Sequence, residues 1–183
     1  MHRPLAFFAA LLFCPCLLAA PQSYTIDTDS TAIRLSWHAF GGILSWAKLT
    51  GVTGNVTLNP ESDFDDHIHV TIPVATLVAS NGLLTWQLKS DMFFESARYP
   101  TIEFTSSRVV NVGNGQYRVF GTLTVRSISR PVILEAVVKE PHSQTLNLNA
   151  TTAISRASYG MDKFALVVDD RIAIAIAIQA KAS

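Results

Sequence analysis

The residues best suited to chemistry are two histidines that lie two positions apart, His67 and His69. Side chains at this spacing share one face of a strand. Asp63, Asp65 and Asp66 come just before them, and two imidazoles with a carboxylate could hold zinc. A solvent-facing strand after an acidic turn is the simpler interpretation. The sequence therefore predicts no metal site.

A third histidine, His38, alternates with the apolar residues Ile33, Leu35 and Trp37, so we expect it at the surface or at a rim. The sequence contains no nucleophile elbow, H-E-x-x-H motif, phosphate-binding glycine loop or dinucleotide fingerprint. No histidine is paired with a plausible nucleophile and an orienting carboxylate. These patterns favour a protein that is not an enzyme, without catalytic residues or a cofactor.

Composition also narrows the function classes. The 183 residues are 49% hydrophobic and only 15% charged, against about 25% charged in ordinary domains. The 14 basic residues balance the 14 acidic ones, so the chain offers no positive field for nucleic acid. We expect a soluble, non-spanning single domain with more apolar surface than a plain core requires.

The first twenty residues are typical of a secretory signal peptide. A short basic start at His2 and Arg3 precedes the apolar run 5–20, which is shorter than the roughly 20 residues of a spanning helix. We expect cleavage between residues 19 and 23, a mature domain over 24–183, and a periplasmic location.

Both cysteines, Cys14 and Cys16, lie inside this leader. The mature domain would then have no disulfide. Phe13 and Pro15 stand where a lipoprotein signature requires a small residue, so we expect no lipid anchor.

Short extended segments make up the rest of the chain, and one helical segment interrupts them. Leucines and phenylalanines near helical spacing predict one or two short helices within 81–100, with Ser90 and Asp91 as candidate caps. About eight strands and one helical insert favour an antiparallel barrel or sandwich. The predicted strands are 31–40, 48–60, 67–78, 101–110, 116–125, 131–139, 145–155 and 171–180.

The last of these strands is unusual because both of its faces are apolar. Isoleucine alternates with alanine from Ile172 to Ile178, whereas a strand with one wet face alternates apolar with polar residues. The pattern alone does not decide which face is internal. Six aromatic residues are most simply read as core, with a ligand pocket as the alternative: Trp37, Trp46, Trp86, Phe40, Phe93 and Phe94.

Five separated motifs, in order, resemble the YceI family of bacterial periplasmic proteins. The resemblance covers Tyr24 to about Ala180. The two most specific motifs are the second and the third. The motifs are "YTID" (24–27), "LKSDMFFESARYPTIEFTS" (88–106), "GTLTVRSISRPVILE" (121–135), "ISRASYGM" (154–161) and "VVDDRIAIAI" (167–176).

The resemblance implies an all-β fold, an extended eight-stranded antiparallel lipocalin-like β-barrel with a short helical insert. Its apolar tunnel would hold a polyisoprenoid chain. We then expect the isoleucines of 171–180 to face the tunnel, and the alanines to allow another element to approach. The candidate tunnel residues are Ile33, Leu35, Trp37, Leu84, Leu88, Phe93, Phe94, Phe104, Ile172, Ile174 and Ile176.

The chain departs from the family pattern where relatives carry charge. Relatives commonly have a histidine at Ala39 and a charged cluster near the helix, which here reads Leu84, Thr85 and Gln87. "SIS" at 127–129 likewise replaces a glycine-containing turn. We expect an intact tunnel that handles the ligand's head group differently.

The leading functional hypothesis is non-enzymatic binding, with periplasmic transport or buffering, of a long-chain isoprenoid or another amphiphilic lipid. The alternative is a structural or stress-protective interaction module whose lumen is filled by its own side chains. The sequence leaves the oligomeric state open between monomer and homodimer.

Overall fold

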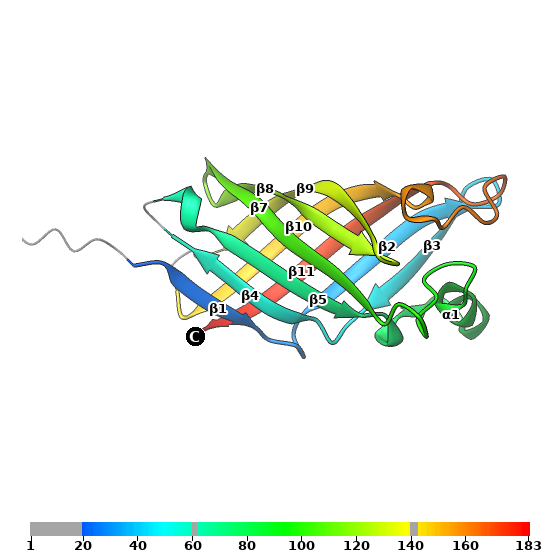
Figure 1. Ribbon diagram of the computed structural model, residues 1–183, viewed down its shortest axis with the longest axis horizontal. Coiled ribbons are helices and arrows are strands. Elements are labelled where there is room, and N and C mark those ends of the chain that lie inside the picture. The colour runs from blue at the N-terminus through cyan, green and yellow to red at the C-terminus, as the bar shows by residue number, and fades with distance from the viewer. Residues whose placement is uncertain (1–19, 60–61, 140–142) are drawn as a thin grey trace, which may run out of the picture.

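Eight strands close into an elongated antiparallel barrel, and a short helix lies at one end (Figure 1). The computed structural model describes residues 20–59, 62–139 and 143–183, so most of the predicted signal peptide lies outside the described residues. The strands are β1 (Gln22–Ile26), β2 (Ala32–Ala39), β3 (Ile43–Leu49), β4 (Thr53–Leu58), β5 (His67–Pro73), β6 (Val78–Ala79), β7 (Thr101–Gly113), β8 (Gln116–Val125), β9 (Ile128–Lys139), β10 (Thr145–Ser155) and β11 (Arg171–Ala182).

The barrel closes because β11 pairs with two successive strands. Its end pairs with β1, where Tyr24 lies opposite Ala182, and its first half pairs with β2, where Leu35 lies opposite Ile174. The eight strands of the closed ring are β1, β4, β5, β7, β8, β9, β10 and β11. Toward the helical end the wall continues through β2, β3 and the two-residue strand β6 instead. The predicted eight-stranded antiparallel barrel is confirmed.

The helical insert contains one α-helix among the described residues, α1 (Gly82–Lys89). Its N-cap is Asn81, whose side chain accepts a hydrogen bond from the Leu84 backbone N–H at 2.8 Å. The prediction of Ser90 as a helix cap is confirmed, and the structure makes it the C-cap of α1. No second helix follows: Glu95 takes a positive φ, and residues 90–100 form turns that lead into β7. The part of the chain that the structure describes also contains three short 3₁₀ helices: η1 (Asp63–Asp65), η2 (Val74–Thr76) and η3 (Ala157–Tyr159).

Two predicted strands had the wrong bounds. The segment 48–60 contains the end of β3 and all of β4, separated by a short link, and 67–78 ends as β5 at Pro73 before η2. Pattern reading missed most of β3. Ile43 and Leu44 are both exposed at its start, so the apolar alternation that identifies a strand is absent there.

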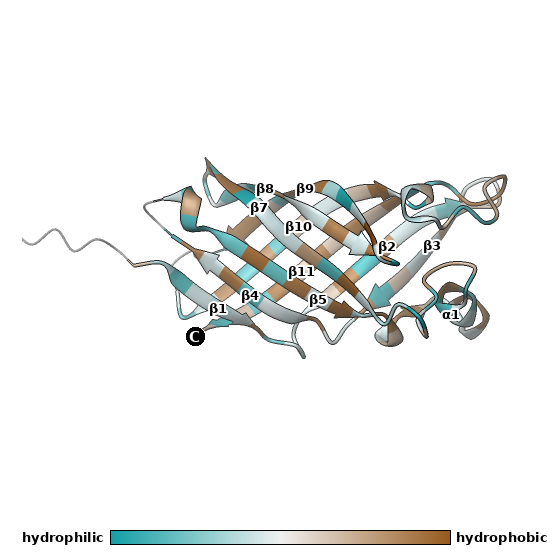
Figure 2. Ribbon diagram, in the orientation of Figure 1, coloured by the Kyte–Doolittle hydropathy of each residue, from teal (hydrophilic) through white to brown (hydrophobic). Residues whose placement is uncertain are grey.

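Hairpin turns fix the register of the long strands. Asn114 and Gly115 both have positive φ between β7 and β8, and so do Arg126 and Ser127 between β8 and β9. Two-residue turns with two positive φ angles match the twist of the strands they join. The first of these turns lies within the segment "NVGNGQ" (111–116), whose Asn-Gly pair is typical of a hairpin. In Figure 2 apolar and polar residues alternate along these strands, as an inside and an outside face require.

Within the described part of the chain, no helix is both long and apolar enough to cross a bilayer.

Candidate ligand-binding cavity

The interior of the barrel is packed at one end and hollow at the other. Tyr24, Val109 and Leu146 are almost completely buried near the end where β1 meets the C-terminus, and they do not line the cavity. Toward α1 the strands enclose a cavity of about 540 Å³. That volume falls in the usual range for small-molecule sites, about 300–1,000 Å³.

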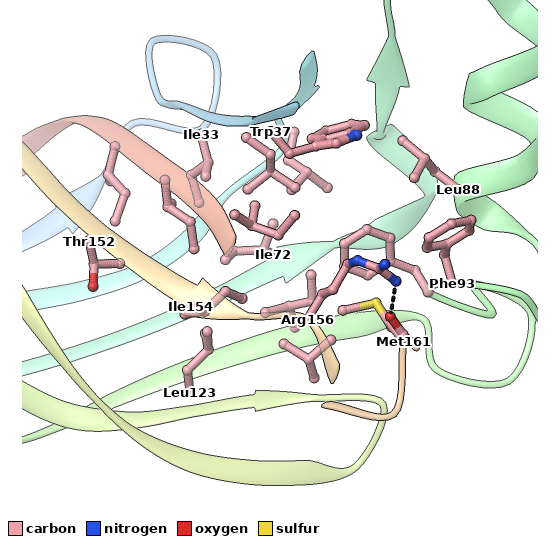
Figure 3. A pocket seen from close by; sticks show the side chains of 18 of the residues that line it. Ile33, Trp37, Ile72, Leu88, Phe93, Leu123, Thr152, Ile154, Arg156 and Met161 are labelled. Carbon is pink, nitrogen blue, oxygen red and sulfur yellow. Dashed lines mark hydrogen bonds between the residues drawn. The ribbon is translucent and has the colours of Figure 1, made fainter. Parts of the chain in front are cut away.

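All eleven residues predicted to form an apolar tunnel lie on the wall of this cavity. They come from β2, α1, the segment that follows α1, β7 and β11. Figure 3 shows Ile33, Trp37, Leu88 and Phe93 pointing into the same space. The structure thus brings together side chains up to about 140 positions apart in the sequence. Their role as ligand contacts belongs to the proposal below.

The structure shows which of the two apolar faces of β11 is internal. Ile172, Ile174, Ile176 and Ile178 line the cavity. The alanines between them, such as Ala175, are exposed on the outer surface. The expected inward orientation of the isoleucines is confirmed. Among the described residues the helical insert is not the element that approaches the alanines, because α1 lies at the barrel's end and not against this face (Figure 1).

The cavity opens at the end that carries α1. Phe40, Ile43, Leu44, Leu83 and Phe164 line it and are also exposed to solvent, so they mark its mouth. The mouth is built from the β2–β3 turn, α1 and the loop between η3 and β11. Hydrogen bonds and a β-bridge join the β2–β3 turn to the loop between η3 and β11. Phe40 N–H donates to the Val167 carbonyl over 2.6 Å, and Ala39 pairs with Val168.

Arg156 is the single charged side chain in the described cavity wall, and it is 3% exposed. Its guanidinium donates to backbone carbonyls of the loop in front of β11. Nε donates to Asp169 (2.9 Å), Nη2 to Val168 (2.9 Å), and Nη1 to Lys163 (2.8 Å) and to Met161. Figure 3 shows the contact with Met161. These bonds use four of the five guanidinium N–H groups, so Arg156 mainly positions the loop at the mouth.

The remaining polar lining is sparse and uncharged. Gln87 of α1 and Thr152 of β10 face the cavity, as do Ser45, Ser80 and Asn81. Leu84, on the same helix as Gln87, also lines the cavity. Thr85 instead ties α1 to β6, where its hydroxyl accepts a hydrogen bond from the Ala79 N–H at 2.9 Å. Apart from Arg156, the described wall of the cavity is therefore uncharged and largely apolar.

Sequence reasoning missed several lining residues near the mouth. Ile154, Arg156, Met161 and Phe164 line the cavity but were not among the candidates. Three of them lie in the "ISRASYGM" motif, which was the available signal. Phe164 carries no sequence signal, because its loop has no periodicity. Its ring stacks on Phe93 at 6.2 Å, a contact that only the fold creates.

The assignment of the aromatic residues to the core is correct for half of the set. Trp37, Phe93 and Phe94 are buried. Phe40 and Trp86 are exposed at 70% and 64%, so their assignment to the core is wrong. Trp46 is also outside the core. It lies half-buried on the outer surface with the Arg34 guanidinium 5.0 Å from its ring centroid.

The three histidines that the structure describes lie away from the cavity wall. His38 is exposed near the mouth, as predicted, with Nδ1 3.7 Å from the Asp169 carboxylate. His67 and His69 lie on β5, and His69 shares a 3.0 Å hydrogen bond with the Thr105 hydroxyl. Among the described residues, no cluster of three or more His, Cys, Asp or Glu side chains has a metal-binding arrangement.

Asp66 is the one buried carboxylate of the acidic turn before β5. It accepts a 2.5 Å hydrogen bond from the Asn59 backbone N–H. Burial raises the pKa of Asp66, that hydrogen bond lowers it, and the neighbouring charges of Asp63 and Asp65 raise it further. The net pKa is above the usual aspartate value. Asp66 is not among the residues that line the cavity.

An antiparallel barrel whose strands enclose an apolar cavity open at one end is lipocalin-like in architecture. The chain belongs to the YceI-like domain family, which it matches over residues 24–180.

Relatives and solved structures agree with this assignment. A UPF0312 protein of Photorhabdus laumondii is 32% identical over 136 residues, covering 70% of this chain and 66% of the relative. A Vibrio campbellii UPF0312 protein is 23% identical, covering 64% of each chain. The matches thus span slightly less than two thirds of the length of these two relatives.

Two solved structures show the same fold. Burkholderia cenocepacia BcnA superposes with a TM-score of 0.78 at 19% identity, covering 85% of this chain and 99% of BcnA. A polyisoprenoid-binding domain from Saccharophagus degradans, implicated in plant cell wall breakdown, gives a TM-score of 0.68 at 12% identity. It covers 87% of this chain and 98% of that domain.

Proposed function

We propose that this protein binds a long-chain isoprenoid or a related lipid in the barrel cavity, without catalysing a reaction on it. The observation that carries the proposal is the cavity of about 540 Å³, whose described wall is apolar except for a few uncharged polar groups and Arg156. Burying an apolar tail there contributes a favourable binding free energy of about 25 cal/mol for each Å² of apolar surface removed from water.

The shape of the site suits a chain better than a compact ligand. The lining isoleucines of β11 run from Ile172 to Ile178, roughly 20 Å along the strand at 3.3 Å per residue. The polyisoprenoid-binding domain from Saccharophagus degradans has the same fold, which supports an isoprenoid as the ligand class. The open space in the lumen argues against the alternative of an interaction module filled by its own side chains.

We also propose that the protein carries or buffers this lipid in the periplasm. The signal-like leader over residues 1–20 supports export. The sparse polar groups at the mouth would orient a head group, while the tail supplies the affinity. A carrier of this kind needs an open mouth, and the rim of exposed lining residues at α1 supports one.

The direct test extracts the purified protein with organic solvent and identifies the extract by mass spectrometry. We expect an isoprenoid close to one per chain. A titration with isoprenoid alcohols should accompany it, using Ala150→Phe to fill the cavity and Thr151→Phe as the matched control. Ala150 is buried and lines the cavity, whereas Thr151 is exposed on the outer face of the same strand.

Ala150→Phe should weaken isoprenoid binding at least tenfold, whereas Thr151→Phe should leave it unchanged. Thermal unfolding of both variants checks that the added ring has not displaced the strands. An extract without lipid, together with no binding in the titration, would refute the proposal. So would equal binding by the two variants.

A further inference from the structure

The cavity mouth carries an unusual concentration of exposed apolar side chains. Eight of the thirteen large hydrophobic residues that are exposed in the described structure lie around it. We call these eight the apolar rim: Phe40, Ile43, Leu44, Leu83, Trp86, Phe164, Leu166 and Val167.

Three separate segments present the rim at one end of the barrel (Figure 1). Phe40 and Ile43 flank the β2–β3 turn, where Phe40, Gly41 and Gly42 all take positive φ and push the tip outward. Leu83 and Trp86 are three positions apart on α1, so they share a side of the helix. Leu84 and Leu88 of the same helix face the cavity, which leaves α1 apolar on two sides.

The loop between η3 and β11 supplies the third segment. Leu166 is fully exposed at its tip, and Phe164 stacks on Phe93, which follows α1. Arg156 fixes this loop from below through its bonds to backbone carbonyls. The loop therefore holds its apolar tip in water although the fold gains no packing from it, which points to a partner outside the chain.

The rim is electrically balanced. The three segments 38–45, 80–89 and 161–171 together contain three basic and three acidic residues. A basic surface would favour anionic lipids or nucleic acid, and an acidic one would repel membranes. A balanced apolar rim favours shallow insertion into an uncharged lipid surface, with Trp86 at the headgroup level where its ring is best accommodated.

We propose that the apolar rim docks the barrel, mouth first, on a phospholipid bilayer. Five rim residues also line the cavity, so the docked mouth forms a continuous apolar path from the acyl chains to the lumen. A long isoprenoid tail could then enter the barrel without crossing water. This inference rests on the proposed function for its purpose, although docking itself can be tested without any ligand.

The test uses two double variants of the whole protein. Trp86→Ser with Leu166→Ser removes rim residues that do not line the cavity. Phe64→Ser with Val112→Ser is the matched control. These residues are also exposed, but they lie at the opposite end of the barrel, where Asn111 N–H donates to Asp63 over 3.1 Å. Flotation with phosphatidylcholine vesicles measures docking. A soluble short isoprenoid alcohol measures cavity binding, and transfer of a labelled polyprenol from vesicles measures loading.

We expect the unaltered protein and the control variant to float with phosphatidylcholine vesicles at low and high salt. The rim variant should bind vesicles at least tenfold less and load polyprenol at least tenfold more slowly, with unchanged binding of the short alcohol. Trp86 fluorescence should shift to the blue on vesicle addition, and the shift should be absent in Trp86→Phe.

Three results would overturn the docking proposal. The first is equal flotation by the rim and control variants. The second is binding that requires anionic lipid and disappears in salt. The third is a dimer lost in the rim variant without any vesicle binding, which would make a second copy of the chain the occupant of the rim. Rim-dependent vesicle binding without isoprenoid binding in solution would support docking and refute the proposed function instead.

Discussion

Arg156 Nη2 donates a hydrogen bond to the carbonyl oxygen of Val168 over 2.9 Å, which ties the end of β10 to the loop before β11. The same guanidinium holds three further carbonyls of that loop. A buried cation with several backbone acceptors is expensive to replace, because each carbonyl loses its partner away from water. The loop between η3 and β11, one of the three segments of the mouth, therefore depends on this side chain.

We expect Arg156→Lys to lower the free energy of unfolding by about 2–4 kcal/mol, because one ammonium group cannot reach carbonyls arranged around a planar fork. Urea denaturation measures the loss. Hydrogen exchange should also quicken in the loop 161–169. Arg171→Lys, at an exposed position, is the control and should change stability by less than about 0.5 kcal/mol. An Arg156→Lys variant that unfolds at the same urea concentration as the wild type would contradict the role of Arg156 in holding this loop.

The two faces of β11 predict opposite effects for the same substitution. Ile174→Asp places a carboxylate on the cavity wall, where it loses hydration, and should abolish isoprenoid binding and lower stability. Ala175→Asp places the same group on the exposed outer face, opposite Arg34 of β2, and should leave binding intact. Ligand titration with circular dichroism as a folding check distinguishes the two. Comparable loss of binding in both variants would mean that the lumen is not the site.

Affinity should depend on the length of the ligand and hardly on salt. Each isoprene unit encloses a few tens of Å² and adds on the order of 1 kcal/mol before ordering costs, at about 25 cal/mol per Å². We expect the dissociation constant to fall with chain length until the cavity is full. Salt screens charges, and the cavity wall is almost uncharged, so binding at low and high salt should agree. Titration with isoprenoids of increasing chain length, at low and high salt, tests both expectations. An affinity that does not change with chain length but falls sharply in salt would exclude the cavity as the binding site.

Asp66 should make the fold less stable at neutral pH than a matched amide would. Burial first, and then the neighbouring carboxylates, raise its folded-state pKa above the unfolded value, so the folded state binds the proton more tightly. As the pH rises through the interval between these two pKa values, the folded state loses stability relative to the unfolded chain.

Asp66→Asn keeps an oxygen that can accept from the Asn59 N–H and removes the charge. The variant should therefore be more stable than the wild type above the raised pKa, and the difference should vanish as the pH falls toward the ordinary aspartate range. Thermal unfolding across a pH series measures it. A variant that is less stable at neutral pH would show that the ionised carboxylate is needed in the turn before β5.

Most of the barrel could be predicted from local pattern. The hairpins around Asn114 and Gly115 are fixed by turn chemistry, and the long strands by alternation. Prediction from the residue pattern failed for the segments near the mouth of the cavity. β3 begins with Ile43 and Leu44 both exposed, and residues 90–100 make turns instead of a second helix. At these places the neighbours across the mouth, and not the local sequence, decide the conformation.

The sequence by itself determined most of the strands, the helical insert, the family and an excess of apolar surface. Isoleucine and alanine are both apolar, so the pattern of β11 could not say which face is internal. Only closure of the barrel, which needs the large side chains inside, put Ile174 on the wall and Ala175 on the surface. Tertiary structure also determined that Trp86 and Phe40 are exposed to solvent. Hydrophobicity predicts that such residues avoid water, but only the positions of α1 and the β2–β3 turn at the open end left them exposed.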